Sequence, residues 1–388
     1  MLVGLSPCPR HASGNVGDQL LVEVTIELIE DIHGLREFEV YFKREDFTSR
    51  LDDINEADAI LLFGFEIEQR QIRPSQYRIA EDLTTVEPPI IPIASCYSFF
   101  PGDRVELRRQ VFGSETRSFI DRVVPACPDE TIPVRDAWVG EVLEQNGYDT
   151  VLTGDPAWYA LERLGDEFHR PQSVEQVVFT TPHSWQYVEQ AKSLLRELTN
   201  EFPDARRIVS LHAAPLERDR EICAAAKKAG WEIHYASHET DNLSLYKRTD
   251  LHVGYRYHGH LAHLRYRRPS ILLEEDSRGR GLTETFGGGG IRAFESEYST
   301  AYRGLPRRFA DSTPIHMAHA LANKVGLTNV LAEYSSLKGN ARPEAVEETI
   351  SMIQNQRSNG WPMLTAIRKT IDETYETGMQ PFLQSALD

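Results

Sequence analysis

The chain has 388 residues, of which 40% are hydrophobic and 26% are charged. This length predicts two soluble globular domains, each large enough to bury an apolar core of its own. Because 59 acidic side chains outnumber 42 basic ones, the net charge is -17, and this charge excludes a nucleic-acid-binding surface over most of the molecule.

Short apolar runs alternate with amphipathic segments in the first half, which predicts parallel strands covered by helices on both faces. The strands are expected at residues 1–5, 38–42, 59–63, 90–95, 131–134 and 151–154. Helices are expected at 19–31 and 136–146, and Gly147 is a typical residue to end the second helix.

The polar stretch 163–176 has no clear period, and the alternation restarts after it. Strands are expected at 177–180, 207–211, 232–235, 251–255 and 270–273, with helices at 185–200, 217–229 and 258–267. Amphipathic helices follow near 315–325, 343–356 and 361–375. We therefore expect an α/β protein with Rossmann-like domains at 1–165 and 176–335, facing a cleft, and helices at 336–388.

The four cysteines, at positions 8, 96, 127 and 223, form no C-x-x-C pair. This spacing argues against a zinc site and a disulfide framework, so we expect no metal and a reducing cytoplasmic location. The amino terminus lacks the features of a signal peptide, and no apolar run approaches the length that spans a bilayer.

A glycine-rich turn, "SGNVGDQLL", separates the first strand from the first helix. Gly14 and Gly17 permit close backbone approach, Asn15 suits a strained turn, and the helix amino terminus offers free N–H groups to an anion. Asp18 is either a helix cap or a proton-transfer group. The turn lacks the spacing of a dinucleotide-binding fingerprint.

The stretch "YRYHGHLAHLRYRR", from Tyr255, places Arg256 and His258 where a strand becomes a helix. An Arg beside a helix amino terminus can bind phosphate or carboxylate, and a neighbouring His can donate a proton near neutral pH. The alternative for Arg256 is a surface salt bridge. On a helical wheel, His260 and His263 share a face with Arg267, opposite Leu261 and Leu264, which predicts a solvated polar face and no metal site.

Further polar side chains follow other predicted strands. Glu275, Asp276 and Arg278 are expected in a loop at the cleft rim, and the glycine-rich stretch 286–292 in a flexible loop. Arg135 and Asp136 are expected where a strand ends and a helix begins, with Asp136 as a helix cap, and Gly154 and Asp155 at a turn after a strand. His183 and His212 each follow a strand and are either cleft-lining or structural. The chain lacks a nucleophile elbow, a Walker loop and an H-E-x-x-H motif, which excludes the common enzymes that use them.

Four of these motifs, in order, resemble those of the polysaccharide pyruvyl transferase family. They are G-N-x-G-D at Gly14 to Asp18, R-D at Arg135, G-D-P-A at Gly154 and R-x-H at Arg256, followed by an acidic and basic segment. The resemblance covers approximately residues 1–290. It implies two Rossmann-like domains arranged as in glycosyltransferase-B enzymes, with the carboxy-terminal helices packed back across the junction.

The resemblance also implies an activity: transfer of the pyruvyl group of phosphoenolpyruvate, without a cofactor, to two hydroxyls of a sugar in a glycan, such as a cell-envelope polysaccharide or a lipid-linked precursor. The donor site would contain Arg256, Tyr257, His258, Arg135 and Arg278. His258 would transfer a proton and Asp18 would be the acceptor-side base. The acceptor side or cleft would contain Gly14, Asn15, Gly17, Asp18, Asp136, Asp155, Glu275 and Asp276.

The chain departs from the family pattern in its first half. Phe65 and Glu66 stand where the family often has glycines, and Val139 stands where it often has serine. Two alternatives therefore stay open. One is a nucleotide-sugar glycosyltransferase of the same architecture, and the other is a catalytically silent sugar-binding relative.

Overall fold

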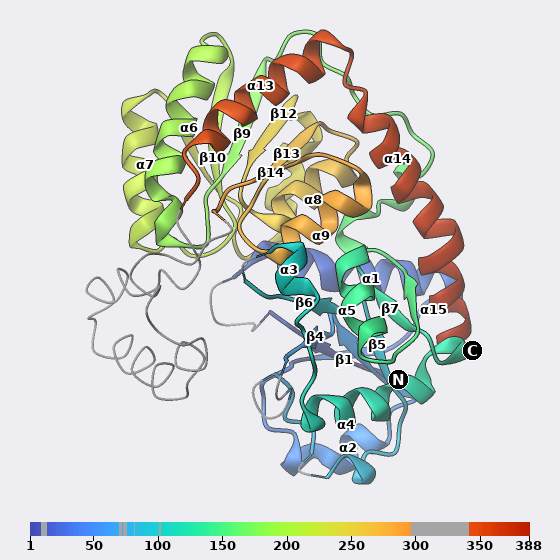
Figure 1. The fold of residues 1–388 in the computed structure, drawn as a ribbon. Helices are drawn as coiled ribbons and strands as arrows, with labels where there is room; N and C mark the ends of the chain where they lie inside the picture. Colours follow the sequence, from blue (N-terminus) through green and yellow to red (C-terminus); the bar gives the residue numbers. More distant parts are fainter. Residues whose placement is uncertain (9–13, 70–71, 73–75, 81, 101, 296–340) are drawn as a thin grey trace, which may run out of the picture.

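The structure is a computed structural model that describes residues 1–8, 14–69, 72, 76–80, 82–100, 102–295 and 341–388. Figure 1 shows two lobes, each built on a parallel β-sheet, with carboxy-terminal helices along one side. The expected α/β fold with two Rossmann-like sheets is confirmed.

The first lobe contains a sheet of four parallel strands in the order β2-β1-β3-β5. Its strands are β1 (Leu2–Ser6), β2 (Phe38–Phe42), β3 (Ala59–Phe63) and β5 (Ile90–Ile93), with the short parallel pairs β4 (Glu66–Ile67) with β6 (Cys96–Tyr97) and β7 (Ile132–Val134) with β8 (Thr150–Leu152). Its helices are α1 (Val16–His33), α2 (Leu51–Asn55), α3 (Arg104–Leu107), α4 (Ser114–Val123) and α5 (Ala137–Gln145). The chain direction across the sheet reverses between β1 and β3, which opens a crevice at their carboxyl ends.

The second lobe contains a sheet of six parallel strands in the order β11-β10-β9-β12-β13-β14. The strands are β9 (Gln176–Thr180), β10 (Arg206–Leu211), β11 (Glu232–Tyr235), β12 (Leu251–Gly254), β13 (Ser270–Glu274) and β14 (Gly290–Arg292). The helices are α6 (Val188–Glu201), α7 (Glu217–Lys228), α8 (Tyr257–Arg265) and α9 (Ser277–Phe286). Here the order reverses between β9 and β12, so a second crevice lies at the ends of these strands.

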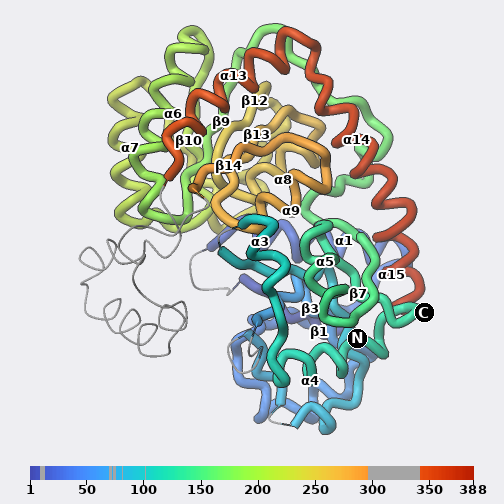
Figure 2. The backbone as a smooth tube through the Cα atoms, viewed as in Figure 1, coloured from blue at the N-terminus to red at the C-terminus, as the bar shows by residue number. Residues whose placement is uncertain are grey.

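The carboxy-terminal helices connect the two lobes, as the tube in Figure 2 makes clear. Helix α13 (Glu344–Ser358) packs on α6, α14 (Met363–Thr374) continues downward, and α15 (Gln380–Ala386) packs on α1. A His33 ring nitrogen lies 3.0 Å from the carbonyl oxygen of Leu383. The helix expected at 315–325 lies outside the described residues.

The segment after β13 differs from the expected loops. Helix α9 begins at Ser277, and the glycine-rich stretch ends in strand β14, which pairs in parallel with β13. A Cβ atom at Gly290 would lie 2.1 Å from the Glu274 carboxylate and 2.4 Å from a Thr283 methyl group. The expectation of a flexible loop is therefore wrong at Gly290, because this glycine allows close packing.

Every residue of helix α8 except His258 is buried, so the predicted solvated face is wrong. His260 and His263 are both 0% exposed. The His260 Nδ1 lies 2.6 Å from the Ser270 hydroxyl, and the His263 Nδ1 lies 2.7 Å from the Gly259 carbonyl oxygen. The His263 ring stacks on His252 and Tyr246, and the His260 ring lies against Phe286. The helical wheel contains no information about these neighbours.

Candidate active site

The turn between β1 and α1 holds its polar side chains in a fixed arrangement. Asn15 is the N-cap, because its Oδ1 accepts a hydrogen bond from the Gly17 amide at 3.3 Å. Its Nδ2 donates to an Asp18 carboxylate oxygen at 2.8 Å. Gly14 has a φ of 56°, which favours glycine. The expectation that Asp18 caps the helix is therefore wrong, because Asn15 is the cap. The Asp18 carboxylate lines a pocket.

Arg256 lies at the start of α8, where β12 ends. Its side chain is buried, and its Nη1 lies 2.7 and 2.9 Å from the two ring nitrogens of His183. Its backbone amide donates to the Thr180 hydroxyl at 3.2 Å. Burial lowers the pKa of Arg256. The alternative of a surface salt bridge is therefore wrong, and the guanidinium lines the same pocket as Asp18.

His258 lies between two carboxylates. Its Nδ1 is 3.8 Å from Asp18 Oδ1 and its Nε2 is 3.7 Å from Asp155 Oδ2. The backbone of Gly17 makes room for the ring, because a Cβ atom there would lie 2.4 Å from the His258 Cβ. The two lobes thus meet at this ring: Asp18 and Asp155 come from the first lobe, and His258 from the second.

Arg135 and Tyr257 form a stacked pair between the lobes. The Arg135 guanidinium carbon lies 4.6 Å from the centre of the Tyr257 ring, a cation–π contact. Both residues line the pocket and both are buried. Burial raises the pKa of Tyr257 well above its usual value. Asp136 caps α5 and accepts hydrogen bonds from the amides of Trp138 and Val139 at 3.0 and 3.1 Å, so its capping role is confirmed.

The acidic residues after β13 contact protein groups. Glu275 is buried and accepts hydrogen bonds from the backbone amides of His183, at 2.9 Å, and Ser184, at 3.2 Å. Asp276 is the N-cap of α9, and its Oδ2 accepts a hydrogen bond from the Arg278 Nη2 at 2.6 Å. Asp276 raises the pKa of Arg278. Glu275 and Asp276 therefore lie in the short connection between β13 and α9, as expected, but outside the residues that line the pocket, whereas Arg278 belongs to α9 and lines it.

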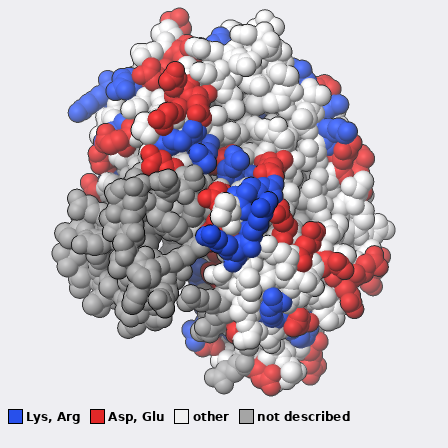
Figure 3. Space-filling model, in the orientation of Figure 1, with Lys and Arg blue, Asp and Glu red and all other residues white. Residues whose placement is uncertain are grey.

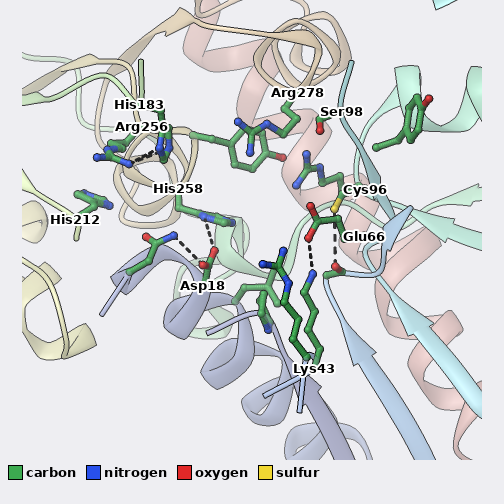
Figure 4. A pocket seen from close by; sticks show the side chains of 18 of the residues that line it. Asp18, Lys43, Glu66, Cys96, Ser98, His183, His212, Arg256, His258 and Arg278 are labelled. Carbon is green, nitrogen blue, oxygen red and sulfur yellow. Dashed lines mark hydrogen bonds and ion pairs between the residues drawn. The ribbon is translucent and has the colours of Figure 1, made fainter. Parts of the chain in front are cut away.

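One cavity of about 390 Å³ lies between the lobes (Figure 4), lined among others by Asp18, Arg135, Arg256, Tyr257, His258 and Arg278. The expected cleft residues Asp136, Asp155, Glu275 and Asp276 do not line it. Residues that follow β1 and β3 line one side, and residues that follow β9, β10 and β12 line the other, so the two crevices face each other. The charged lining residues are Lys43, Arg44, Arg135, Arg256, Arg278, Asp18 and Glu66. Five cations and two carboxylates make the pocket basic, in contrast to the chain as a whole.

The outer surface differs from the pocket. In Figure 3, Asp and Glu side chains are spread over much of the visible face, and the largest group of Lys and Arg lies near the middle of the view. Within the ranges that the structure describes, no three His, Cys, Asp or Glu side chains are grouped so that they could hold a metal ion. Within the same ranges, no helix is long and apolar enough to cross a membrane.

A model of the polysaccharide pyruvyl transferase family matches residues 15–277. The chain belongs to this family. The match covers three of the motifs in full, around Arg135, Gly154 and Arg256, and the first one from Asn15 to Asp18. The family is one of enzymes, and its members act on glycans. No curated relative matches the chain in sequence.

Solved structures share the architecture at low sequence identity. A protein from Listeria monocytogenes assigned as a UDP-N-acetylglucosamine 2-epimerase is 10% identical, with a TM-score of 0.50, covering 100% of this chain and 93% of the other. S. aureus MnaA with UDP is 10% identical, with a TM-score of 0.47 and coverages of 92% and 96%. The E. coli heptosyltransferase WaaC is 11% identical, with a TM-score of 0.37 and coverages of 70% and 88%. The fold of this family member is glycosyltransferase-B-like.

Sequence reasoning missed an ion pair in the pocket wall of the first lobe. Lys43, just after β2, has a side chain only 2% exposed and binds the Glu66 carboxylate, whose side chain is 36% exposed. Its Nζ also lies 5.4 Å from the centre of the Tyr77 ring. Burial raises the pKa of Glu66, but Lys43 outweighs this effect and the net shift is downward. The position of Lys43 at a strand end was a usable signal.

The departures from the family pattern have separate structural roles. Phe65 is buried and stacks on Phe119 at 5.8 Å between ring centres. Val139 is buried in the first turn of α5. Of these departures Glu66 alone lines the pocket, so it is the departure with a direct route to substrate choice.

His183 and His212 both line the pocket, although each by itself had suggested a structural residue. A His212 ring nitrogen lies 2.6 Å from the Tyr246 hydroxyl, which lies 2.6 Å from the Ser210 hydroxyl. Burial, together with the charge of Arg256, lowers the pKa of His212 well below its usual value. A neutral imidazole therefore faces the guanidinium.

Proposed function

We propose that this protein transfers the pyruvyl group of phosphoenolpyruvate to two hydroxyls of a sugar in a glycan or glycoconjugate, forming a ketal and releasing phosphate. The observation that carries the proposal is the pairing of Arg256 and His258 at the start of α8 in a pocket with five cations and two carboxylates. The family match supports the reaction class.

The donor would bind at the second lobe. Phosphoenolpyruvate carries a carboxylate and a phosphate, and both need cations or N–H donors when water is excluded. Arg256 and the free amides at the start of α8 suit one anionic group. Arg135 and Arg278, beside the Tyr257 ring, suit the other. The neutral His212 ring near Arg256 leaves the positive charge of Arg256 available to the donor.

The chemistry would begin at the donor methylene. Protonation of this carbon by His258 gives an oxocarbenium-like centre, and one sugar hydroxyl attacks it while Asp18 accepts the hydroxyl proton. The bond between the former enol carbon and the phosphate oxygen then breaks, and the second hydroxyl closes the ring. One of the two hydroxyl protons restores the proton that His258 gave to the methylene carbon, and the other leaves with phosphate.

The acceptor would bind against the first lobe. Asn15 orients Asp18 by a hydrogen bond of 2.8 Å, and Gly14 and Gly17 keep the turn close to the second lobe. At the other end of the pocket from Arg256, the Glu66 carboxylate lines the cavity and forms an ion pair with Lys43 (Figure 4). A carboxylate of this kind suits sugar hydroxyls as hydrogen-bond donors.

This assignment gives each part of the chain a role. Residues 1–165 would form the acceptor domain and residues 176–335 the donor domain, with the helices of 336–388 connecting the two. The four cysteines are free thiols, which fits action in the cytoplasm. A lipid-linked acceptor would be reached there without a membrane-spanning segment.

The experiment that tests the proposal is calorimetric binding of phosphoenolpyruvate, UDP and GDP to the wild type and to Arg256→Ala. The donor can be tested without knowledge of the acceptor. We expect selective binding of phosphoenolpyruvate that the substitution strongly weakens. Binding of a nucleotide in place of phosphoenolpyruvate would contradict the proposal and favour a nucleotide-sugar glycosyltransferase.

A further inference from the structure

Asp155 lies next to His258, outside the residues that line the pocket, and is the N-cap of the 3-10 turn Pro156–Trp158. Its side chain is 0% exposed. One carboxylate oxygen, Oδ1, accepts a hydrogen bond from the Ala157 amide at 3.0 Å and caps this turn. The cap fixes the carboxylate in one orientation, so the direction of the second oxygen is determined by the backbone.

The second oxygen of Asp155 faces His258. Asp155 Oδ2 and His258 Nε2 are both buried, neither has a hydrogen-bond partner, and they lie 3.7 Å apart. Burial raises the pKa of Asp155, but His258 and Arg135 outweigh it and the net shift is downward. Two buried polar atoms without partners are costly, and a small movement of the ring would join them in a hydrogen bond. Such bonds often shorten when the substrate binds.

We propose that Asp155 is a positioning residue that holds His258 in the tautomer with the proton on Nε2, so that Nδ1 faces Asp18 and the pocket. The proposal rests on the proposed function, in which His258 transfers a proton. A His nitrogen that donates to a buried carboxylate leaves the other nitrogen for chemistry. Protonated His258 would then give its Nδ1 proton to the methylene carbon and keep its Nε2 proton in place.

Asp136 shows that the cap alone does not produce this arrangement. It is also 0% exposed and also caps a helix start with one oxygen. Its other oxygen, however, lies 3.4 Å from the Arg135 Nε. Burial raises the pKa of Asp136, whereas the pKa of Asp155 is lowered. The two aspartates therefore have the same local role, and Asp155 alone of the two has a histidine in front of it.

The test is to measure the tautomer of His258 by nitrogen NMR of the full-length protein labelled with 15N-histidine. The His258 signals are identified by their loss in His258→Gln. Asp155→Asn should keep the cap, because Asn is also a good N-cap, and it should place its NH₂ group opposite Nε2. We expect the proton on Nε2 in the wild type and on Nδ1 in Asp155→Asn.

The matched control is Asp103→Asn, which changes another N-cap aspartate, that of α3. It should leave the His258 tautomer unchanged. A wild type with the proton on Nδ1 would overturn the proposal, even if Asp155→Asn did not fold. So would an Asp155→Asn protein that keeps the proton on Nε2. Neither result depends on phosphoenolpyruvate or on an acceptor, so failure of the proposed function would be seen separately, in the calorimetry.

Discussion

The two ends of the pocket are supported by different kinds of buried polar residue. Behind the donor end, in the second lobe, His252, His260 and His263 are 0% exposed and His212 is 1% exposed. Behind the acceptor end, in the first lobe, Lys43 is buried in an ion pair with Glu66.

The histidines form a packed polar core. The His263 ring stacks on His252 at 4.3 Å and on Tyr246 at 3.9 Å between ring centres. Burial lowers the pKa values of His260 and His263 to about 3, so these rings are neutral. The donor end therefore keeps its positive charge on arginines over a neutral core, whereas the acceptor end balances a cation with a carboxylate. The two ends should respond differently to substitution and to acid.

The sharpest test of this difference is the loss of donor binding. Arg256→Ala should weaken phosphoenolpyruvate binding by about 100-fold, because hydrogen bonds to charged groups contribute roughly 1.5–3 kcal/mol each. Glu66→Gln, at the other end, should change this affinity by less than about threefold. Arg207→Ala removes a partly buried arginine of the same sheet outside the pocket, and calorimetry on the three variants gives the comparison. Equal losses in Arg256→Ala and Glu66→Gln would contradict separate donor and acceptor ends.

The second prediction concerns the ion pair at the acceptor end. Lys43→Met leaves Glu66 without its partner, and removal of one member of a buried pair costs about 3–5 kcal/mol. Because the Glu66 side chain is 36% exposed, we expect a smaller loss in the free energy of unfolding, about 2 kcal/mol, in urea denaturation. Lys192→Met, which removes the exposed contacts with Glu189 and Glu221, should cost less than about 1 kcal/mol. If the two losses were equal, the Lys43 pair would be an ordinary surface contact.

The sequence predicted the donor end better than the acceptor end, and the reason is physical. Arg256 and His258 follow a strand and begin a helix within three residues, so the local pattern was enough to place them at the edge of the sheet. Lys43 and Glu66 pair between two separate strands, and no local period connects them. Glu66 had been noticed as a departure from the family, with no partner assigned.

Two wrong expectations arose from tertiary contacts that a local pattern does not contain. His260 and His263 were placed on a solvated face because the groups that cover their rings lie on other elements of the second lobe, which the local pattern does not contain. These are Ser270 and Phe286 for His260, and His252 and Tyr246 for His263. Residues 290–292 were expected in a loop because glycine usually disfavours strands. In the structure, Gly290 is the residue that fits beside Glu274 and Thr283.

The third prediction uses acid to separate the two ends. A buried histidine with a lowered pKa takes up a proton more readily in the unfolded chain, so its contribution to stability is lost as pH falls below about 6.5. For His260 and His263 this amounts to roughly 1 kcal/mol each between pH 7.5 and pH 5.5. The pKa of Glu66 is lowered, so its contribution persists to lower pH and is lost only below about 4.5.

Hydrogen exchange is measured at pH 7.5 and pH 5.5 and corrected for the intrinsic exchange rate. At pH 5.5, β12 and α8 should lose more protection than β2 and β3. The charged groups near these histidines include Arg256 and Arg268, and both guanidinium groups stay positively charged as pH falls. His263→Phe should reduce the acid effect by about a quarter, since it removes one of the four buried rings whose pKa is lowered, those of His212, His252, His260 and His263. Equal loss of protection in both lobes would show that the buried histidines do not set the acid response.

The smallest expected effect is a gain in affinity for phosphoenolpyruvate, and it tests whether Arg278 belongs to the donor end. Asp276 neutralises Arg278 through three hydrogen bonds of 2.6 to 3.1 Å. Asp276→Asn keeps an N-cap for α9 but removes the negative charge, so the pocket gains one positive charge. Phosphoenolpyruvate should then bind about threefold more tightly at low salt, and salt should reduce the gain. Asp103→Asn, a cap change outside the pocket, should leave the affinity unchanged. If Asp276→Asn weakened binding, the carboxylate would be needed to orient Arg278, and a fixed guanidinium would matter more to the donor site than its net charge.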